Sequence, residues 1–419
     1  MNWAECGIVL LVAIFSTIAL TPLAKKLAFA FDAIDYPDAR RVNVRPVPRM
    51  GGVAMFGGML VTSVVIALGA RFLGWANPFS NPYDMNVRFG FIFAGVVMMV
   101  AVGVVDDVVD LNAHVKFLGQ VIAACFVTAS GLLLSNIQNP FVRGGFIEFG
   151  IFAYPITVLY LVAFANVINL IDGLDGLASG ISAISASTIF IFAVLVGRIE
   201  SALLCAMLVG VCLGFLKANH HPASIFMGDS GSLLLGLSLG IVSLFAVARS
   251  TLFVSLLVPI VVAGVPVTDA AMAIIRRRRA HQPVDMPDTG HIHHRLLQAG
   301  YSHQATVNIM WGWTAALAVC SIVLFETTGP ARLVVILVVA AITCFAVWKL
   351  HLIEPVLRHY YNPRIRHRGE PIEVSLDLID EDKSSEGQSG DASRRSVCQS
   401  VPDVAGANPT PRGGDEEHR

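Results

Sequence analysis

Residues 151–180 read IFAYPITVLYLVAFANVINLIDGLDGLASG, and this stretch decides the fold class. Its first part, as far as Asn169, carries no charged residue and is about as long as a helix that crosses the roughly 30 Å hydrocarbon core of a bilayer. Polar residues follow, and Gly173 and Gly176 allow the backbone to turn before a second apolar run begins at Leu177. The stretch predicts two membrane-spanning helices joined by a short polar connection.

The whole chain has the same character. Of its 419 residues, 55% are hydrophobic and only 14% are charged, which excludes a soluble enzyme and a DNA-binding domain. Lys and Arg number 29 against 30 Asp and Glu, so the net charge of −1 offers no basic surface for nucleic acid. Six of the seven cysteines lie in apolar runs and none forms a CxxC pair, so we interpret them as core-packing residues.

Eleven apolar runs divide the chain. We predict an all-α, polytopic integral membrane protein of about eleven transmembrane helices with cytoplasmic active-site loops. Residues 1–350 form its membrane domain, and residues 351–419 form a cytoplasmic polar tail whose composition predicts disorder from about residue 370. The expected spans are residues 5–24, 51–70, 89–105, 116–134, 151–169, 177–196, 201–217, 232–248, 252–275, 305–325 and 332–350.

The charges predict how these spans are oriented. Residues 1–6 carry no Lys or Arg, and Lys25 and Lys26 follow the first apolar run, so we expect a retained helix with its N-terminus outside. By alternation the odd-numbered connections are cytoplasmic. They and their margins hold thirteen Lys and Arg residues against six outside, and ten more follow from Lys349. We therefore expect a multi-pass protein of the plasma (inner) membrane.

Polar groups gather in the connections expected on the cytoplasmic side. Asp106 and Asp107 end the third span and Lys116 begins the fourth. A carboxylate beside hydrocarbon costs several kcal/mol unless it has a cation, a partner or a wet cavity, so this pair predicts function. Asp110 is equally consistent with a solvated loop cap. In the next such connection, Asn166, Asn169, Asp172 and Asp175 recur at a spacing of three and offer the hard oxygen ligands that suit Mg²⁺.

Three further motifs suit phosphate. The sequence FMGDSGS contains Asp229 and Ser230 and begins a span, so its free helix N-terminal amides predict a phosphate cradle, whereas a hydrolytic role for Ser230 is disfavoured. Phe226 fits either stacking on a base or core packing. The HIHHR cluster fits a pyrophosphate better than a zinc ion. Arg49 and its neighbours Arg40, Arg41 and Arg45 carry guanidinium groups that suit phosphate, as well as a positive-inside loop.

These motifs occur in one order over residues 5–350: DxPxxRR with PxPRxGG, DDxxD, NxxNxxDGxDGLA, FMGDSGS and HIHHRL. In this the chain resembles the polyprenyl-phosphate N-acetylhexosamine-1-phosphate transferase family, which includes the phospho-MurNAc-pentapeptide translocase. HIHHRL favours the GlcNAc-1-phosphate branch. The resemblance departs at Asn43, where the family commonly has His, so an acid-base role there is in doubt.

The resemblance implies transfer of a sugar 1-phosphate, most simply GlcNAc 1-phosphate, from a UDP-sugar to undecaprenyl phosphate. UMP is released, and the product is the first lipid-linked intermediate of an envelope glycan such as lipopolysaccharide or teichoic acid. Mg²⁺ is the implied cofactor, with Mn²⁺ as its substitute. The implied metal ligands are Asn169 and Asp229, the catalytic residues are Asp106, Asp107, Asp172, His293 and His294, and the substrate contacts are Lys116, Asp175, Asn219, Phe226, Arg49, His291 and Arg295.

Several alternatives stay open at this level. Intramembrane acids also mark secondary transporters, although here the polar groups cluster at one membrane face and no half-repeat is visible. A membrane zinc protein built on the histidine loop is a second rival. We favour direct attack of the lipid phosphate on the β-phosphorus, with a covalent Asp intermediate as the other route. The sequence leaves open the identity of the HexNAc, the glycan pathway and a homodimeric assembly.

Overall fold

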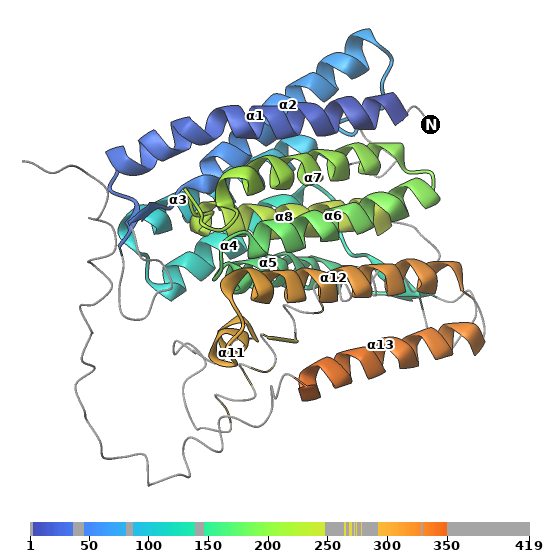
Figure 1. Cartoon of the computed structure of the whole chain (residues 1–419). Coiled ribbons are helices and arrows are strands. Elements are labelled where there is room, and N and C mark those ends of the chain that lie inside the picture. Colours follow the sequence, from blue (N-terminus) through green and yellow to red (C-terminus); the bar gives the residue numbers. More distant parts are fainter. Residues whose placement is uncertain are drawn as a thin grey trace, which may run out of the picture. The chain divides into compact units, whose positions relative to one another are not determined.

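The computed structural model describes residues 3–36, 46–80, 87–138, 146–247, 292–327 and 330–349, with a few more between 264 and 278. Long helices dominate these residues (Figure 1). They are α1 Trp3–Ala30, α2 Gly51–Phe72, α3 Phe89–Val109, α4 Ala113–Ala129, α5 Ala153–Ile171, α6 Leu177–Leu195, α7 Ile199–Asn219, α8 Gly228–Val247, α11 Ile292–Gln298, α12 His303–Glu326 and α13 Pro330–Lys349.

Strands are few and short in the described part of the chain. β1 Ile34–Asp35 pairs antiparallel with β2 Val47–Pro48, and β3 Asn136–Gln138 pairs antiparallel with β4 Phe146–Glu148. A single turn of 3₁₀ helix, η2 Gly150–Phe152, leads into α5. The strands therefore only join helices, and the predicted all-α class is confirmed.

The predicted membrane spans coincide with helices wherever the structure describes them. Within the described residues, eight helices are long and apolar enough to cross a membrane, and α4 and the apolar part of α13 are shorter. Ten of the eleven predicted spans correspond to these helices. The multi-pass membrane class is therefore confirmed. The span predicted at 252–275 lies almost wholly outside the described residues, so the number of eleven spans stays a prediction.

Two predicted boundaries differ from the structure more than the others do. α1 runs on to Ala30, past Lys25 and Lys26, because long lysine side chains can extend their charges toward water without ending a helix. The chain leaves the helical path only near Asp32, whose φ is +54°. α4 stops at Ala129 rather than at residue 134, because Gly131 takes φ +92° and turns the chain.

α8 is the central helix of the bundle. In its most apolar stretch of 18 residues, 94% of the residues are buried inside the protein, whereas the corresponding figure for α1 is 28%. Helices α2, α3, α5, α6 and α7 all contact it, and Figure 1 shows it among its neighbours. The N-terminal end of α8 carries the GDSGS motif. The motif is therefore fixed by packing on several sides.

Glycines allow the backbones to approach closely around this end of α8. A Cβ added at Gly52 of α2 would lie 2.2 Å from the backbone nitrogen of Gly231. One added at Gly103 of α3 would lie 2.4 Å from Ser230 Cα. The amides of Gly51 and Gly52 donate hydrogen bonds to the carbonyls of the chain just before α8, Phe226 and Met227, both at 3.0 Å. Helices α2 and α3 are thereby both held closely against the start of α8.

We predict that Gly52→Ala destabilises the protein by about 1–3 kcal/mol or more, because the new methyl group meets backbone that cannot move aside. Gly312→Ala on α12 is the matched control, since nothing lies within 4 Å of its Cβ position. Thermal unfolding of the two variants in the same detergent compares them. Equal midpoints would contradict the close approach.

Candidate active site

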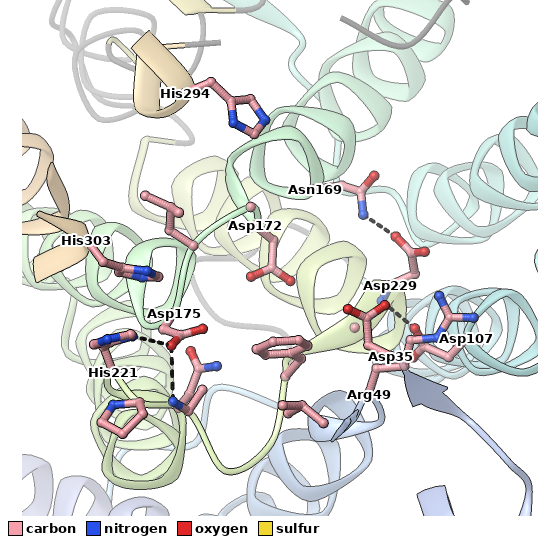
Figure 2. Close-up of a pocket in the computed structure, with 18 of the residues that line it drawn as sticks. Asp35, Arg49, Asp107, Asn169, Asp172, Asp175, His221, Asp229, His294 and His303 are labelled. Atoms are coloured by element: carbon pink, nitrogen blue, oxygen red, sulfur yellow. Dashed lines mark hydrogen bonds and ion pairs between the residues drawn. The ribbon is translucent and has the colours of Figure 1, made fainter. Parts of the chain in front are cut away.

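A pocket of about 920 Å³ lies at the end of the bundle where α8 begins. Figure 2 shows its walls, formed by side chains that are far apart in the sequence. Ten residues singled out in the sequence line it: Arg49, Asp107, Lys116, Asn169, Asp172, Asp175, Asn219, Phe226, Asp229 and His294. Each of the five sequence motifs thus contributes at least one side chain to the pocket, and the histidine motif contributes His294.

Lys116 connects two of the carboxylates. Its Nζ lies 2.8 Å from Asp106 Oδ2 and 2.8 Å from Asp229 Oδ1. Asp106 is 7% exposed and does not line the pocket; it lies behind the lysine, where it also accepts a 2.8 Å hydrogen bond from the Leu111 amide. Lys116 therefore presents one positive charge to the pocket from a fixed position.

Asn169 completes the group on the other side of Asp229. Its Nδ2 donates to Asp229 Oδ1 and, at 2.8 Å, to Ser232 Oγ. The C-terminal end of α5 is thus joined to the first turn of α8. Asp229 and Asn169, the two predicted metal ligands, are neighbours in space although 60 residues apart in sequence.

Asp107 has a different partner from its neighbour Asp106. Its Oδ1 accepts a 2.7 Å hydrogen bond from the Asp229 amide and its Oδ2 a 3.1 Å hydrogen bond from the Ser230 amide. Asp107 therefore caps the N-terminus of α8 from another helix, where the helix dipole also favours an anion. Gly228, at φ +70°, leaves room for it, because a Cβ there would lie 2.6 Å from Asp107 Oδ1.

This cap corrects one prediction. The sequence suggested that free amides at the start of α8 bind phosphate, but the amides of Asp229 and Ser230 are occupied by Asp107. An external anion is not needed at these two amides because an internal carboxylate already accepts their hydrogen bonds. The amides of Asp229 and Ser230 are therefore not available to a ligand in this arrangement.

We predict that Asp107→Ala lowers the free energy of unfolding by about 1–2 kcal/mol, the usual cost of a lost N-cap. Asp107→Asn should lose less, because its remaining oxygen can still accept one of the two amide hydrogen bonds. Chemical denaturation of both variants in one detergent measures the difference. If the Asp107→Ala variant were as stable as the unsubstituted protein, the cap would contribute nothing to the free energy of unfolding.

Asp172 follows the last residue of α5 and faces the pocket (Figure 2). Burial raises the pKa of its carboxyl group well above the ordinary value, and the nearby charges of Asp229, Asp107 and Asp175 raise the pKa further. So many carboxylates around one space favour a cation between them. Their hard oxygen atoms suit Mg²⁺, which the residues present therefore fit.

Asp175 belongs to a second group on the opposite side of the pocket (Figure 2). Its Oδ2 lies 2.7 Å from His221 Nδ1 and accepts a 3.1 Å hydrogen bond from the Ala223 amide. The His221 ring stacks on that of His303, with ring centroids 4.2 Å apart. Sequence reasoning missed both histidines. His221 follows Asn219 closely in a connection that was predicted to be cytoplasmic, a signal that could have found it. His303 at the start of α12 gave no such signal.

Asn219, predicted as a substrate contact, lines the pocket and makes three hydrogen bonds within the protein. Oδ1 accepts from the Gly176 amide at 3.1 Å and from Ser179 Oγ at 2.9 Å, and Nδ2 donates to the Ile225 carbonyl at 3.0 Å. The side chain is 3% exposed. Asn219 thus holds the end of α7 to the start of α6 and shapes the pocket wall.

The loop before α2 supplies Arg49 to the pocket. Its Nη2 lies 2.7 Å from Asp110 Oδ1, and Asp110 is 79% exposed with φ +50° at the end of α3. Asp110 therefore takes the loop-cap alternative and holds Arg49 at the pocket rim. The expected neighbours Arg40, Arg41, Arg45 and Asn43 lie outside the described residues.

The histidine motif is placed in part. His294 lines the pocket from α11, whose first amide, that of Ile292, donates at 2.9 Å to Asp269 Oδ1. Arg295 on the same helix is 8% exposed and is not among the residues that line the pocket, because that position of α11 faces inward. His291 and the side chain of His293 lie outside the described part of the chain.

The fold and the site together define a multi-pass membrane protein with a polar, charged pocket at one end of its helices. The model of the family named glycosyl transferase family 4 matches residues 89–247. The chain is 38% identical over 318 residues to a probable undecaprenyl-phosphate N-acetylglucosaminyl 1-phosphate transferase of Bacillus subtilis, covering 76% of this chain and 84% of that protein. The chain belongs to glycosyl transferase family 4, and it is a membrane transferase.

Two further relatives show the breadth of the family. A decaprenyl-phosphate N-acetylglucosaminephosphotransferase of Mycolicibacterium smegmatis is 35% identical over 364 residues, 81% of this chain and 87% of the relative. A phospho-N-acetylmuramoyl-pentapeptide-transferase of Clostridioides difficile is 30% identical over 328 residues, 72% and 91% respectively. The resemblance predicted from the motifs is confirmed, and the comparisons give no support to a transporter.

Proposed function

We propose that this protein transfers GlcNAc 1-phosphate from UDP-GlcNAc to a polyprenyl phosphate and releases UMP. The observation that carries the proposal is the pocket itself, in which Lys116 is held between Asp106 and Asp229 beside Asn169 and Asp172. The two relatives at 38% and 35% identity are named for polyprenyl phosphate and N-acetylglucosamine, which favours that sugar over other HexNAc groups.

Asp229 and Asn169, with Asp172 beside them, are the residues we expect to hold Mg²⁺, or Mn²⁺ in its place. Such a cation neutralises charge on a nucleotide pyrophosphate. Lys116 and Arg49 supply further positive charge at the pocket wall. Because Arg49 is tied to Asp110, its guanidinium group is already oriented before a substrate arrives.

The chemistry that we favour is direct displacement. An oxygen of the lipid phosphate attacks the β-phosphorus of UDP-GlcNAc, and the bond from that phosphorus to the UMP oxygen breaks. A phosphate monoester is already anionic near neutral pH, so no strong base is required. Asp106 contacts Lys116 and the Leu111 amide rather than the pocket, which supports an orienting role for it over proton removal.

The test uses detergent-purified protein with UDP-GlcNAc, polyprenyl phosphate and Mg²⁺, and measures UMP. UMP should appear only when both substrates are present, EDTA should abolish it, and Mn²⁺ should restore it. Asp229→Asn should reduce kcat by about 10²-fold or more, because an anionic ligand is lost. Glu148→Gln in β4, the same chemical change on an exposed carboxylate, is the control and should keep full activity.

Two results would contradict the proposal. Turnover that persists in EDTA would exclude a required metal ion. Absence of UMP with every UDP-HexNAc tested would exclude the transferase function. A burst of about one UMP per enzyme from UDP-GlcNAc alone would replace direct displacement by a covalent intermediate. A panel of UDP-sugars in the same assay identifies the sugar donor.

We further propose that the pocket faces the cytoplasm of a cell whose plasma membrane holds the protein, with the N-terminus outside. The thirteen-to-six asymmetry of positive residues supports this orientation. Assembly as a homodimer stays a prediction of the sequence alone.

Cys398 in the polar tail tests the orientation, and it lies outside the described residues. A membrane-impermeant thiol reagent should label it only after the membrane is opened, since the tail is expected to be cytoplasmic. Cys398→Ser supplies the background from the six other cysteines. Labelling of Cys398 in intact cells would reverse the orientation.

A further inference from the structure

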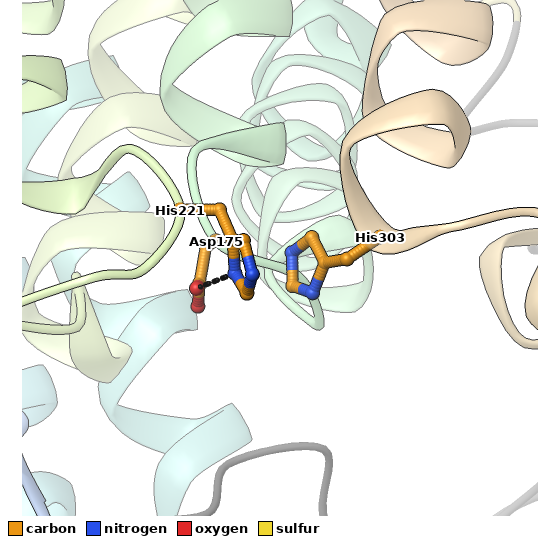
Figure 3. Close-up of side chains that lie close together, drawn as sticks. All are labelled: Asp175, His221 and His303. Carbon is orange, nitrogen blue, oxygen red and sulfur yellow. Dashed lines mark hydrogen bonds and ion pairs between the residues drawn. The ribbon is translucent and has the colours of Figure 1, made fainter. Parts of the chain in front are cut away.

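His221 and His303 form, with Asp175, a compact group that the proposed chemistry does not use, and we call it the Asp175 cluster (Figure 3). The three side chains come from the α5–α6 connection, the α7–α8 connection and the first residue of α12. All three line the pocket. Segments separated by up to 128 residues thus meet through these side chains.

The hydrogen bonds of the cluster leave one oxygen of Asp175 available. A carboxylate only accepts, so His221 Nδ1 carries the proton in the 2.7 Å contact with Oδ2. The Ala223 amide donates to the same oxygen at 3.1 Å. Figure 2 shows both interactions on one oxygen, with the other turned away from the histidines toward the pocket interior. His221 therefore fixes the direction in which Asp175 Oδ1 points.

His303 supports His221 with its ring face. The two rings are stacked, with centroids 4.2 Å apart and planes inclined by 23°. Both ring nitrogens of His303 are buried and have no hydrogen-bond partner among the described residues. His303 is thus placed to limit the rotation of His221.

A metal ion is a weaker explanation of the cluster. One ligand atom from each residue lies within 4.8 Å of the others, a spacing that an ion could draw together. However, imidazole binds metal in the plane of its ring, and two nearly parallel rings do not aim their lone pairs at one point. The stacked arrangement suits positioning better than ligation.

The ligand of Asp175 follows from the two sides of the pocket. Lys116, Asn169 and Asp229 occupy the side opposite the cluster, and that side suits phosphates and their cation. An oriented carboxylate oxygen repels phosphate but accepts a hydrogen bond from a neutral N–H or O–H group. The nucleoside half of a nucleotide sugar carries such groups on its base and its ribose.

We infer that His221 and His303 are positioning residues, which hold Asp175 so that its free oxygen accepts a hydrogen bond from the nucleoside of the donor substrate. The inference rests on the proposed function for the identity of that substrate. It assigns the two histidines to nucleotide affinity and leaves the transfer step to the opposite side of the pocket.

The first test compares two substitutions of His221. His221→Ala should raise the KM for UDP-GlcNAc about tenfold, while kcat falls by no more than about threefold, because only an oriented binding contact is loosened. In His221→Asn the amide nitrogen lies about where Nδ1 was, so it should recover most of the affinity. Equal losses in the two variants, or a fall in kcat with KM unchanged, would overturn the inference.

The second test separates stacking from nitrogen chemistry. His303→Phe keeps a flat ring against His221 and should retain most of the affinity, whereas His303→Ala should raise KM severalfold. A Phe variant as impaired as the Ala variant would show that the ring nitrogens matter. Co²⁺ added to the purified protein should give no visible absorption bands that His303→Phe removes; such bands would identify a metal site and overturn the positioning role.

Calorimetric titration with UDP distinguishes this inference from the proposed function. UDP binding about tenfold weaker in His221→Ala than in the unsubstituted protein supports the inference even if no sugar phosphate is transferred. Transfer with normal UDP affinity in His221→Ala, or no measurable UDP binding to the unsubstituted protein, would overturn the inference and leave the transfer assay to decide the function.

Discussion

The ammonium group of Lys116 lies 2.8 Å from the carboxylates of both Asp106 and Asp229, and the arrangement of the pocket depends on this pair of contacts. Charges at the ends of apolar helices are costly unless they are paired. Lys116 of α4 pairs with one acid from the neighbouring helix α3 and with one acid from the start of α8, the central helix of the bundle. The close backbone contact of Gly103 with the start of α8 holds α3 and α8 near enough for the bridge to form.

Much of this could be predicted from the sequence. Uninterrupted apolar runs fixed the helices, and acids and amides placed at their ends marked which connections meet, because polar groups next to hydrocarbon need partners. The resemblance to the family implied one site for Asp229 and Asn169, and the structure shows these two side chains hydrogen-bonded to each other. The class of the protein followed from the order of those motifs, and the family comparison agrees.

What could not be predicted depends on side-chain partners in space. Adjacent acids look alike in sequence, yet Asp106 faces Lys116 whereas Asp107 caps α8. Asn219 also joins the end of α7 to the start of α6 through its side-chain amide, which its sequence motif does not indicate. His303 belongs to no motif, and only the packing of α12 brings its ring onto His221. Pattern identifies which residues gather; it does not say which atom each will satisfy.

The cap that Asp107 forms on α8 has a consequence for selectivity. An exposed helix N-terminus attracts any small anion, including the inorganic phosphate and sulfate that are plentiful in cells. Here a carboxylate belonging to the protein already fills that position and cannot diffuse away. The backbone amides of Asp229 and Ser230 therefore do not bind small anions unselectively. An anionic ligand must instead be held by side chains such as Lys116 and Arg49, each of which already has a carboxylate partner.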